Sequence, residues 1–193
     1  MLYDKDIREP LFDFLDDIYV TNRIIEEKQM GRSRADVVLV TPEAVFGIEI
    51  KSDADTYARL KRQVRDYNLF YDYNYVVVGT SHAHHIAEHV PKWWGIITVE
   101  MENGKPDFYM LRKPDKNPKV KWKRKLSMLW RPELAHIQEI NNMPEYKQKS
   151  KVFVIDKIIE KIPEEILQFQ VCEELMQRDY NEIGKIIEAY KKQ

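Results

Sequence analysis

Cysteine is almost missing from this sequence, because Cys172 is the single one among 193 residues. A disulfide within the chain and a zinc site built from several of its own thiolates are therefore excluded. No stretch approaches the roughly 18 consecutive apolar residues that a membrane helix needs. The amino-terminal residues are charged from Asp4 onward, unlike a secretory signal. We therefore expect a cytoplasmic protein without a membrane partner.

The chain also has little net charge, at −1, although 33% of its residues are charged. Hydrophobic residues make up 44% and aromatic residues 11%, which is enough apolar material to exclude wholesale disorder. The charge is uneven along the chain. Residues 112–131 contain nine basic residues and one acid, so this segment carries +8 and the remainder −9. The length allows one ordinary domain plus an appendage.

The first hundred residues alternate between patterns typical of helices and of strands. Apolar residues three and four apart predict helices, and short Val- and Ile-rich runs predict strands. The expected elements are helices at 4–19, 55–73 and 83–90 and strands at 23–30, 35–40, 44–51, 75–79 and 95–100. A helix between two strands requires a crossover to a parallel neighbour. The expected fold is α/β, a mixed central sheet in an αβββαβαβ core, flanked by helices.

The pattern changes after residue 102. Three prolines and the basic residues predict a linker or irregular arm over 103–131. Isoleucine and leucine at helical spacing near the end of the chain predict a C-terminal helical extension of two or three helices. The expected organisation is a core at 1–102, a basic arm at 103–131 and a helical extension at 132–193.

One predicted strand carries charged residues where apolar ones are expected. Glu49 and Lys51 point to one face of this strand, while Ile48 and Ile50 point to the other. A solvated edge strand is one interpretation, because burying an unpaired ion is costly. Asp36 opens a neighbouring, otherwise apolar strand, and the turn between the strands can bring it beside Glu49. Two converging carboxylates suit a hard cation such as Mg²⁺, and a nearby lysine can orient or deprotonate a water.

These residues resemble the PD-(D/E)XK nuclease superfamily, in which an aspartate precedes a Glu-x-Lys strand and helices lie before and after. Ala35 departs from that pattern, since the name-giving motif has proline there. The chain is similar in more detail to one small bacterial and phage family within the superfamily. The matching segments are Asp6–Leu11, Gly31–Asp36, Gly47–Thr56 and Pro91–Ile96. The resemblance covers roughly residues 1 to 100.

The resemblance implies a restriction-endonuclease-like fold. It also implies hydrolysis of phosphodiester bonds, with DNA as the expected substrate. It implies that Asp36 and Glu49 hold Mg²⁺, for which Mn²⁺ can substitute, with help from the Ile50 carbonyl. Lys51 would position the attacking water. Glu9 matches the place where many members supply a further acid to the metal, although a solvated helix acid is the alternative.

Further residues are candidates for the site and for contact with nucleic acid. Gln63 and Tyr67 match the Gln-x-x-x-Tyr element of exonuclease-like members, which implies a catalytic place for Gln63 and a nucleic-acid contact for Tyr67. The other candidates are Arg34, Lys61 and Arg62 near the site and Lys121, Lys123, Arg124 and Lys125 in the basic arm. The arm also contains tryptophans that can stack on bases. A solvated loop packed against the acidic remainder is the alternative.

Two aromatic or histidine-rich segments favour structural roles. His85 and His89 are four apart on one helix and can bind a metal, but no second ligand cluster accompanies them, so an exposed helix is preferred. Trp93 and Trp94 favour core packing.

Two functions follow. The first is a metal-dependent nuclease acting on DNA, which could work as a homodimer. The alternative is a catalytically inactive nuclease-like module that binds nucleic acid or a protein partner.

Overall fold

The computed structural model describes residues 3–30, 33–53 and 55–179. The chain divides into two compact units, Met1–Val120 and Lys121–Gln193. The last part of the predicted helical extension, residues 180–193, lies outside the described residues. Among the residues described, no helix is both long and apolar enough to cross a membrane.

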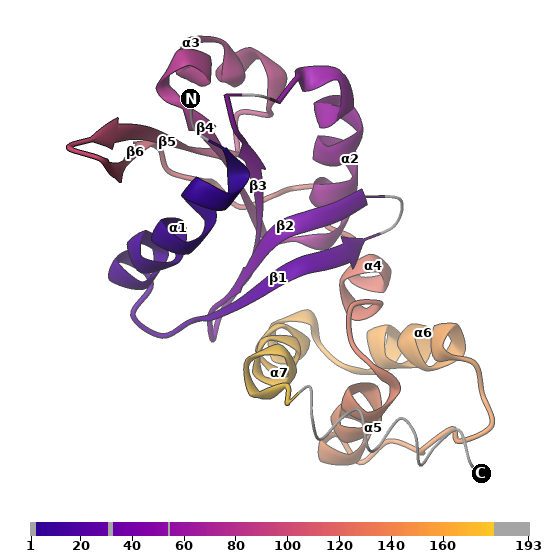
Figure 1. The fold of residues 1–193 in the computed structure, drawn as a ribbon. Coiled ribbons are helices and arrows are strands. Elements are labelled where there is room, and N and C mark those ends of the chain that lie inside the picture. The colour runs from indigo at the N-terminus through magenta and orange to yellow at the C-terminus, as the bar shows by residue number, and fades with distance from the viewer. Residues whose placement is uncertain (1–2, 31–32, 54, 180–193) are drawn as a thin grey trace. The chain divides into compact units, whose positions relative to one another are not determined.

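Unit 1 is a six-stranded mixed sheet flanked by helices (Figure 1). Its elements are α1 (Asp4–Ile18), β1 (Arg23–Met30), β2 (Ser33–Val40), β3 (Val45–Lys51), η1 (Tyr57–Arg59), α2 (Leu60–Phe70), β4 (Tyr73–Gly79), α3 (Thr80–His89), β5 (Gly95–Glu102) and β6 (Lys105–Arg112). The strands lie side by side in chain order. The predicted α/β class and the αβββαβαβ order are confirmed, with β6 added at the end.

The pairing of the strands follows the lengths of their connections. Short turns join β1, β2 and β3, which form an antiparallel meander. Helices α2 and α3 return the chain across the sheet, so β3, β4 and β5 are parallel. Every residue of β3 is buried, as is typical of a central strand covered on both faces.

Strand β6 corrects the prediction of an irregular arm over 103–131. Asn103 and Gly104 have positive φ angles and turn the chain back, so that β6 pairs antiparallel with β5. Exposed and half-buried residues alternate along this edge strand, with Phe108 and Met110 packed against the core. The strand contains one proline and three charged residues, so its sequence lacks the apolar run that would have predicted a strand.

Alternation of side chains gives the sheet two different faces. Helix α1 buries Ile7, Leu11 and Leu15 against a hydrophobic cluster on one face, which includes Ile48 and Val77. The neighbouring residues of β3 point to the opposite face, toward α2. The charged residues of β3 therefore lie on the face away from the main hydrophobic cluster.

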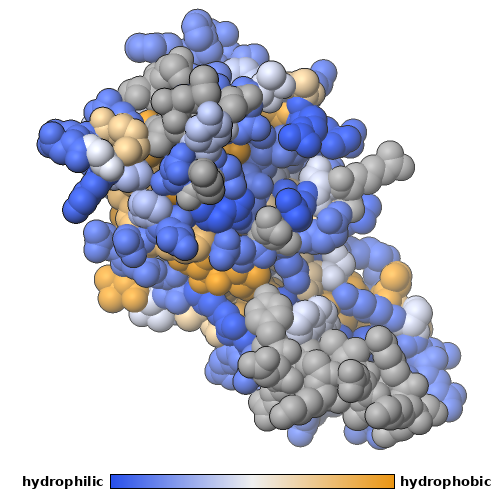
Figure 2. Space-filling model, in the orientation of Figure 1, coloured by the Kyte–Doolittle hydropathy of each residue, from blue (hydrophilic) through white to orange (hydrophobic). Residues whose placement is uncertain are grey.

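Unit 2 consists of helices, which confirms the predicted C-terminal helical extension. They are α4 (Trp122–Leu126), α5 (Arg131–Ile140), α6 (Lys151–Lys161) and α7 (Glu164–Gln177). Each longer helix buries aliphatic residues, such as Leu134, Ile158 and Val171. On the face drawn in Figure 2 most of the surface of the described residues is hydrophilic, with hydrophobic side chains in small groups.

Candidate functional site

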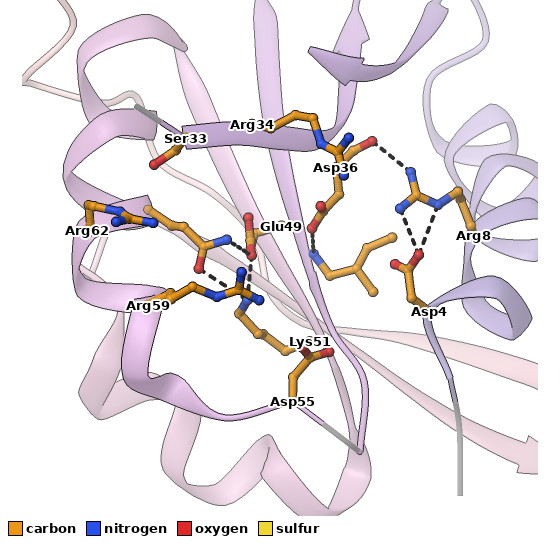
Figure 3. A pocket seen from close by; sticks show the side chains of 12 residues that line it. Asp4, Arg8, Ser33, Arg34, Asp36, Glu49, Lys51, Asp55, Arg59 and Arg62 are labelled. Carbon is orange, nitrogen blue, oxygen red and sulfur yellow. Dashed lines mark hydrogen bonds and ion pairs between the residues drawn. The ribbon is translucent and has the colours of Figure 1, made fainter. Parts of the chain in front are cut away.

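A pocket of about 350 Å³ lies beside β2 and β3 in unit 1 (Figure 3). Its lining comes from α1, β2, β3, the following loop, η1 and α2. The lining residues are Asp4, Arg8, Ser33, Arg34, Asp36, Glu49, Ile50, Lys51, Asp55, Arg59, Arg62 and Gln63. Asp36, Glu49, Lys51 and Gln63, the four predicted catalytic residues, are thus brought together.

Strand register places Asp36 next to the charged end of β3. Val37 pairs with Ile48, and the Ile50 amide donates a 2.9 Å hydrogen bond to Oδ2 of Asp36. The Asp36 side chain consequently lies on the same face of the sheet as Glu49. The short connection at residues 41–44 joins the two strands and makes this approach possible.

Glu49 is held by donors on both carboxylate oxygens. Lys51 Nζ donates to Oε1 over 2.6 Å, and Gln63 Nε2 donates to the same oxygen. The Tyr67 hydroxyl donates to Oε2 over 2.8 Å. Glu49 and Lys51 are only 1% and 3% exposed, so the interpretation of β3 as a solvated edge strand is wrong.

Tyr67 is the first correction to the predicted nucleic-acid contacts. Its side chain is fully buried, and its ring packs over Gly47, where a Cβ atom would lie 2.6 Å from the ring. Glycine at this position lets the tyrosine reach across the sheet to Glu49 and to the backbone amide of Asp36. Tyr67 therefore positions the acidic residues and is not accessible to a nucleic acid.

The two carboxyl groups share the centre of the pocket, where the Lys51 ammonium pairs with Glu49. Burial and the neighbouring Glu49 charge raise the pKa of Asp36 to about 7, although the Ile50 amide and Lys51 oppose the shift. Burial also raises the pKa of Glu49, while Lys51, Tyr67 and Gln63 lower it. Both carboxyl groups are thus harder to ionise than a carboxyl group in water.

Helix α1 approaches the pocket through residues that differ from the predicted one. Glu9 is exposed and does not line the pocket, because it lies on the opposite side of α1 from the buried Ile7 and Leu11. Asp4 and Arg8 line the pocket instead. Their four-residue spacing, typical of an ion pair on a helix, was the indication available in the sequence.

Arg8 connects α1 to the site. It donates to Oδ2 of Asp4 over 2.8 Å and to the backbone carbonyl of Asp36 over 3.0 Å. This bridge links the helix to β2 at Asp36, whose side chain is partly buried. Asp4 is thereby held at the rim as a third acid, with a side chain that is 45% exposed.

The remaining basic candidates of unit 1 divide into two groups. Arg34 and Arg62 line the pocket, as does Arg59, which the sequence analysis did not select. Lys61 is exposed on α2 but does not line the pocket, so its contact with nucleic acid stays a prediction.

The donor set fits a hard divalent cation that keeps part of its water shell. Asp36 and Glu49 supply carboxylate oxygens, and Ile50 lines the same pocket through β3. Within residues 3–30, 33–53 and 55–179, no group of three or more His, Cys, Asp or Glu side chains is arranged for a metal ion. A site with two carboxylates suits Mg²⁺, which completes its coordination with water and phosphate oxygens.

The basic residues predicted in unit 2 differ from one another in accessibility. Lys121 and Arg124 are exposed, and Lys123 pairs with Asp156 at 2.8 Å. Lys125 is fully buried, hydrogen bonds to Gln168 and lies over the Trp122 ring, 4.9 Å from its centroid. The prediction that Lys125 contacts nucleic acid is therefore wrong, because the short helix α4 turns this side chain inward.

The tryptophan and histidine segments have the structures expected of them. Trp94 is fully buried, and its indole N–H donates to Asn68 over 2.8 Å, which confirms core packing. His84, His85 and His89 are exposed on α3, which confirms an exposed helix at this position.

Comparison with known proteins gives one family and one distant structure. The family model described as "Bacteriophage P4 protein cII" matches residues 1–191. A solved structure of SfsA from Pyrococcus furiosus in complex with Ca²⁺ is similar to this chain at a TM-score of 0.33 and 16% identity. That similarity covers 61% of this chain and 62% of SfsA, less than two thirds of its length. No curated protein matches the chain.

Proposed function

The chain belongs to this family of bacteriophage P4 protein cII, and we propose that it is a metal-dependent nuclease. The proposed reaction is hydrolysis of phosphodiester bonds, with DNA as the preferred substrate. The observation that supports the proposal is the convergence of Asp36, Glu49 and Lys51 in one pocket. The resemblance of these residues to the PD-(D/E)XK pattern supports the same reaction.

The pocket combines negative charge at its centre with arginines at its rim. Asp36 and Glu49 would hold Mg²⁺ or Mn²⁺ together with the Ile50 carbonyl, while Asp4 lies in the pocket lining, paired with Arg8. When bound, the cation would act as a Lewis acid on the scissile phosphate and lower the pKa of a water.

Lys51 is placed to hold the attacking water. Its ammonium group has three N–H donors, and two of them point to Glu49 Oε1 and Gln63 Oε1, at 2.6 and 3.2 Å. The third donor is available for a water or a phosphate oxygen. Gln63 and Tyr67 keep Glu49 in place while Lys51 acts, because each donates to one of its oxygens.

The test is hydrolysis of single-stranded, duplex and branched DNA with Mg²⁺ or Mn²⁺. Wild type is expected to cleave at least one form, and Lys51→Ala to lose roughly 10²- to 10⁴-fold in rate. Asp36→Ala is expected to lose both hydrolysis and Mn²⁺ binding, whereas Lys51→Ala keeps Mn²⁺ binding in a calorimetric titration. Lys92→Ala, which removes an exposed lysine outside the pocket, is the matched control for Lys51→Ala and should cleave like wild type.

Failure of the test favours the second function. If wild type binds DNA but cleaves none of the three forms with either metal, the chain is a nuclease-like binding module. Equal cleavage by wild type and by both pocket variants would overturn the assignment of these residues. Unchanged Mn²⁺ affinity in Asp36→Ala would exclude Asp36 as a ligand.

A further inference from the structure

Two arginines of the pocket have no partner among the residues that the structure describes. Arg59 ends η1 and Arg62 lies in the first turn of α2, and both are exposed. Among the described residues, neither forms a hydrogen bond or an ion pair, whereas Arg8 is bound to Asp4 and to the Asp36 carbonyl. Their guanidinium groups are thus available for a ligand.

Arg59 and Arg62 lie at the start of α2, where positive charge destabilises a helix. Acids are favoured in the first turn of a helix, where the backbone N–H groups create partial positive charge. The first turn of α2 contains no acid, and Arg59, Lys61 and Arg62 are grouped there instead. Each exposed cation at this end of a helix has a small cost in stability, and a bound anion would offset that cost.

The two side chains can act on one ligand. Residues three apart on a helix are neighbours, and both arginines line the same pocket as the acidic residues. Figure 3 shows Arg59 and Arg62 on the α2 side of Glu49 and Lys51, with Asp36 and Arg8 on the other side. An anion between the arginines would therefore lie next to the proposed reaction centre, outside the carboxylates.

We propose that Arg59 and Arg62 form a subsite for a backbone phosphate of the substrate strand, next to the phosphate that is cleaved. This inference rests on the proposed nuclease function and adds the direction from which the strand enters, across η1 and the start of α2. Guanidinium groups suit this ligand, because their planar N–H donors pair with two phosphate oxygens at once. Positive charge at this subsite would hold the strand without competing for the metal ligands.

Binding can be separated from cleavage with the full chain and no divalent cation. The measurement is the fluorescence anisotropy of labelled single-stranded and duplex oligonucleotides between 50 and 300 mM NaCl, ranges of salt in which phosphate contacts weaken steeply. Arg59→Gln and Arg62→Gln are each expected to weaken binding about tenfold at low salt. Each should also reduce the slope of log K against log[salt] by about 0.7 for single strands or 0.9 for duplex.

Arg65→Gln is the matched control, because Arg65 is an exposed arginine of α2 that does not line the pocket. It should change neither the affinity nor the slope. Arg62→Lys keeps the charge and should restore the slope while recovering only part of the affinity. Unchanged thermal unfolding of each variant shows that the fold is intact.

The outcomes distinguish the subsite from the nuclease. If wild type cleaves DNA and the two glutamine variants bind like Arg65→Gln, the subsite is wrong and the nuclease stands. If wild type never cleaves but both variants lose affinity and slope as described, Arg59 and Arg62 bind a backbone phosphate and the nuclease proposal fails.

Discussion

Each unit of the chain buries a carboxylate beside a cation, but the two surroundings differ. In unit 2, the two oxygens of Glu133 accept hydrogen bonds from Nε and Nη2 of Arg178, each over 2.6 Å. Glu133 also accepts a hydrogen bond from the Trp130 amide. In unit 1, Glu49 accepts a hydrogen bond from Lys51, but it lies in an open pocket near a second carboxylate, Asp36. A buried acid and base are therefore not enough to indicate a site. The feature that indicates a functional site is the second carboxylate, Asp36, which Lys51 does not neutralise.

The largest expected effect concerns the pair in unit 2. Glu133→Ala should lower the free energy of unfolding by about 3–5 kcal/mol, because it leaves Arg178 buried without its bidentate partner. Urea denaturation followed by tryptophan fluorescence measures the change. Glu145→Ala removes an exposed pair with Lys147 and should cost less than about 1 kcal/mol. Similar losses in both variants would contradict the view of Glu133 as a satisfied structural acid.

In the pocket of unit 1, removal of a carboxylate charge is expected to raise the free energy of unfolding when no metal is bound. Because the pKa of Asp36 rises from 3.8 to about 7 on folding, the stability linked to its proton is full below about pH 4. That stability is lost as the pH rises from about 4 to about 7. Asp36→Asn removes the charge, so it should raise the free energy of unfolding at pH 8 by as much as about 4 kcal/mol.

The gain should shrink toward zero at pH 4, where Asp36 is already protonated. Thermal unfolding of wild type and Asp36→Asn in EDTA across pH 4–8 measures the difference. A gain that does not depend on pH would show that Asp36 carries no unfavourable charge in the folded protein. Added Mn²⁺ should stabilise wild type but not the asparagine variant.

A smaller effect distinguishes two buried tyrosines that pack over Gly47. Tyr67→Phe removes a hydrogen bond to the Glu49 carboxylate and should cost about 1.5–3 kcal/mol. Tyr71 is also fully buried, but among the described residues its hydroxyl has no hydrogen-bond partner, so Tyr71→Phe should be neutral or stabilising. Paired unfolding measurements decide the point. Equal losses would contradict the view that the Tyr67 hydroxyl stabilises the fold through its contact with Glu49.

Much of the fold could be predicted because its patterns are local. Val- and Ile-rich runs and apolar residues at helical spacing located the elements of the αβββαβαβ core and the C-terminal helices. Strand β6 was missed because an edge strand exposes half of its side chains, and its apolar residues are then too few to form a run. The same reason applies to any strand with one solvated face.

The candidate site was predictable in part. Asp36, Glu49 and Lys51 could be placed together because alternation along β3 and a short turn to β2 leave few other arrangements. Glu9 was named because the resemblance implies an acid on the first helix, but in the structure Asp4 lines the pocket and Glu9 does not. Lys125 was expected to be exposed from its charge alone, yet a tryptophan and a glutamine enclose it.

By itself, the sequence determined the α/β class, the order of the core elements and the three charged residues on two neighbouring strands. These follow from side-chain periodicity, which is a property of short segments. The tertiary structure alone decided which acids and arginines share the pocket, that Tyr67 is buried, and that Lys125 points inward. Contacts between segments distant in the chain set the burial and the charge balance of each group, and no local pattern contains them.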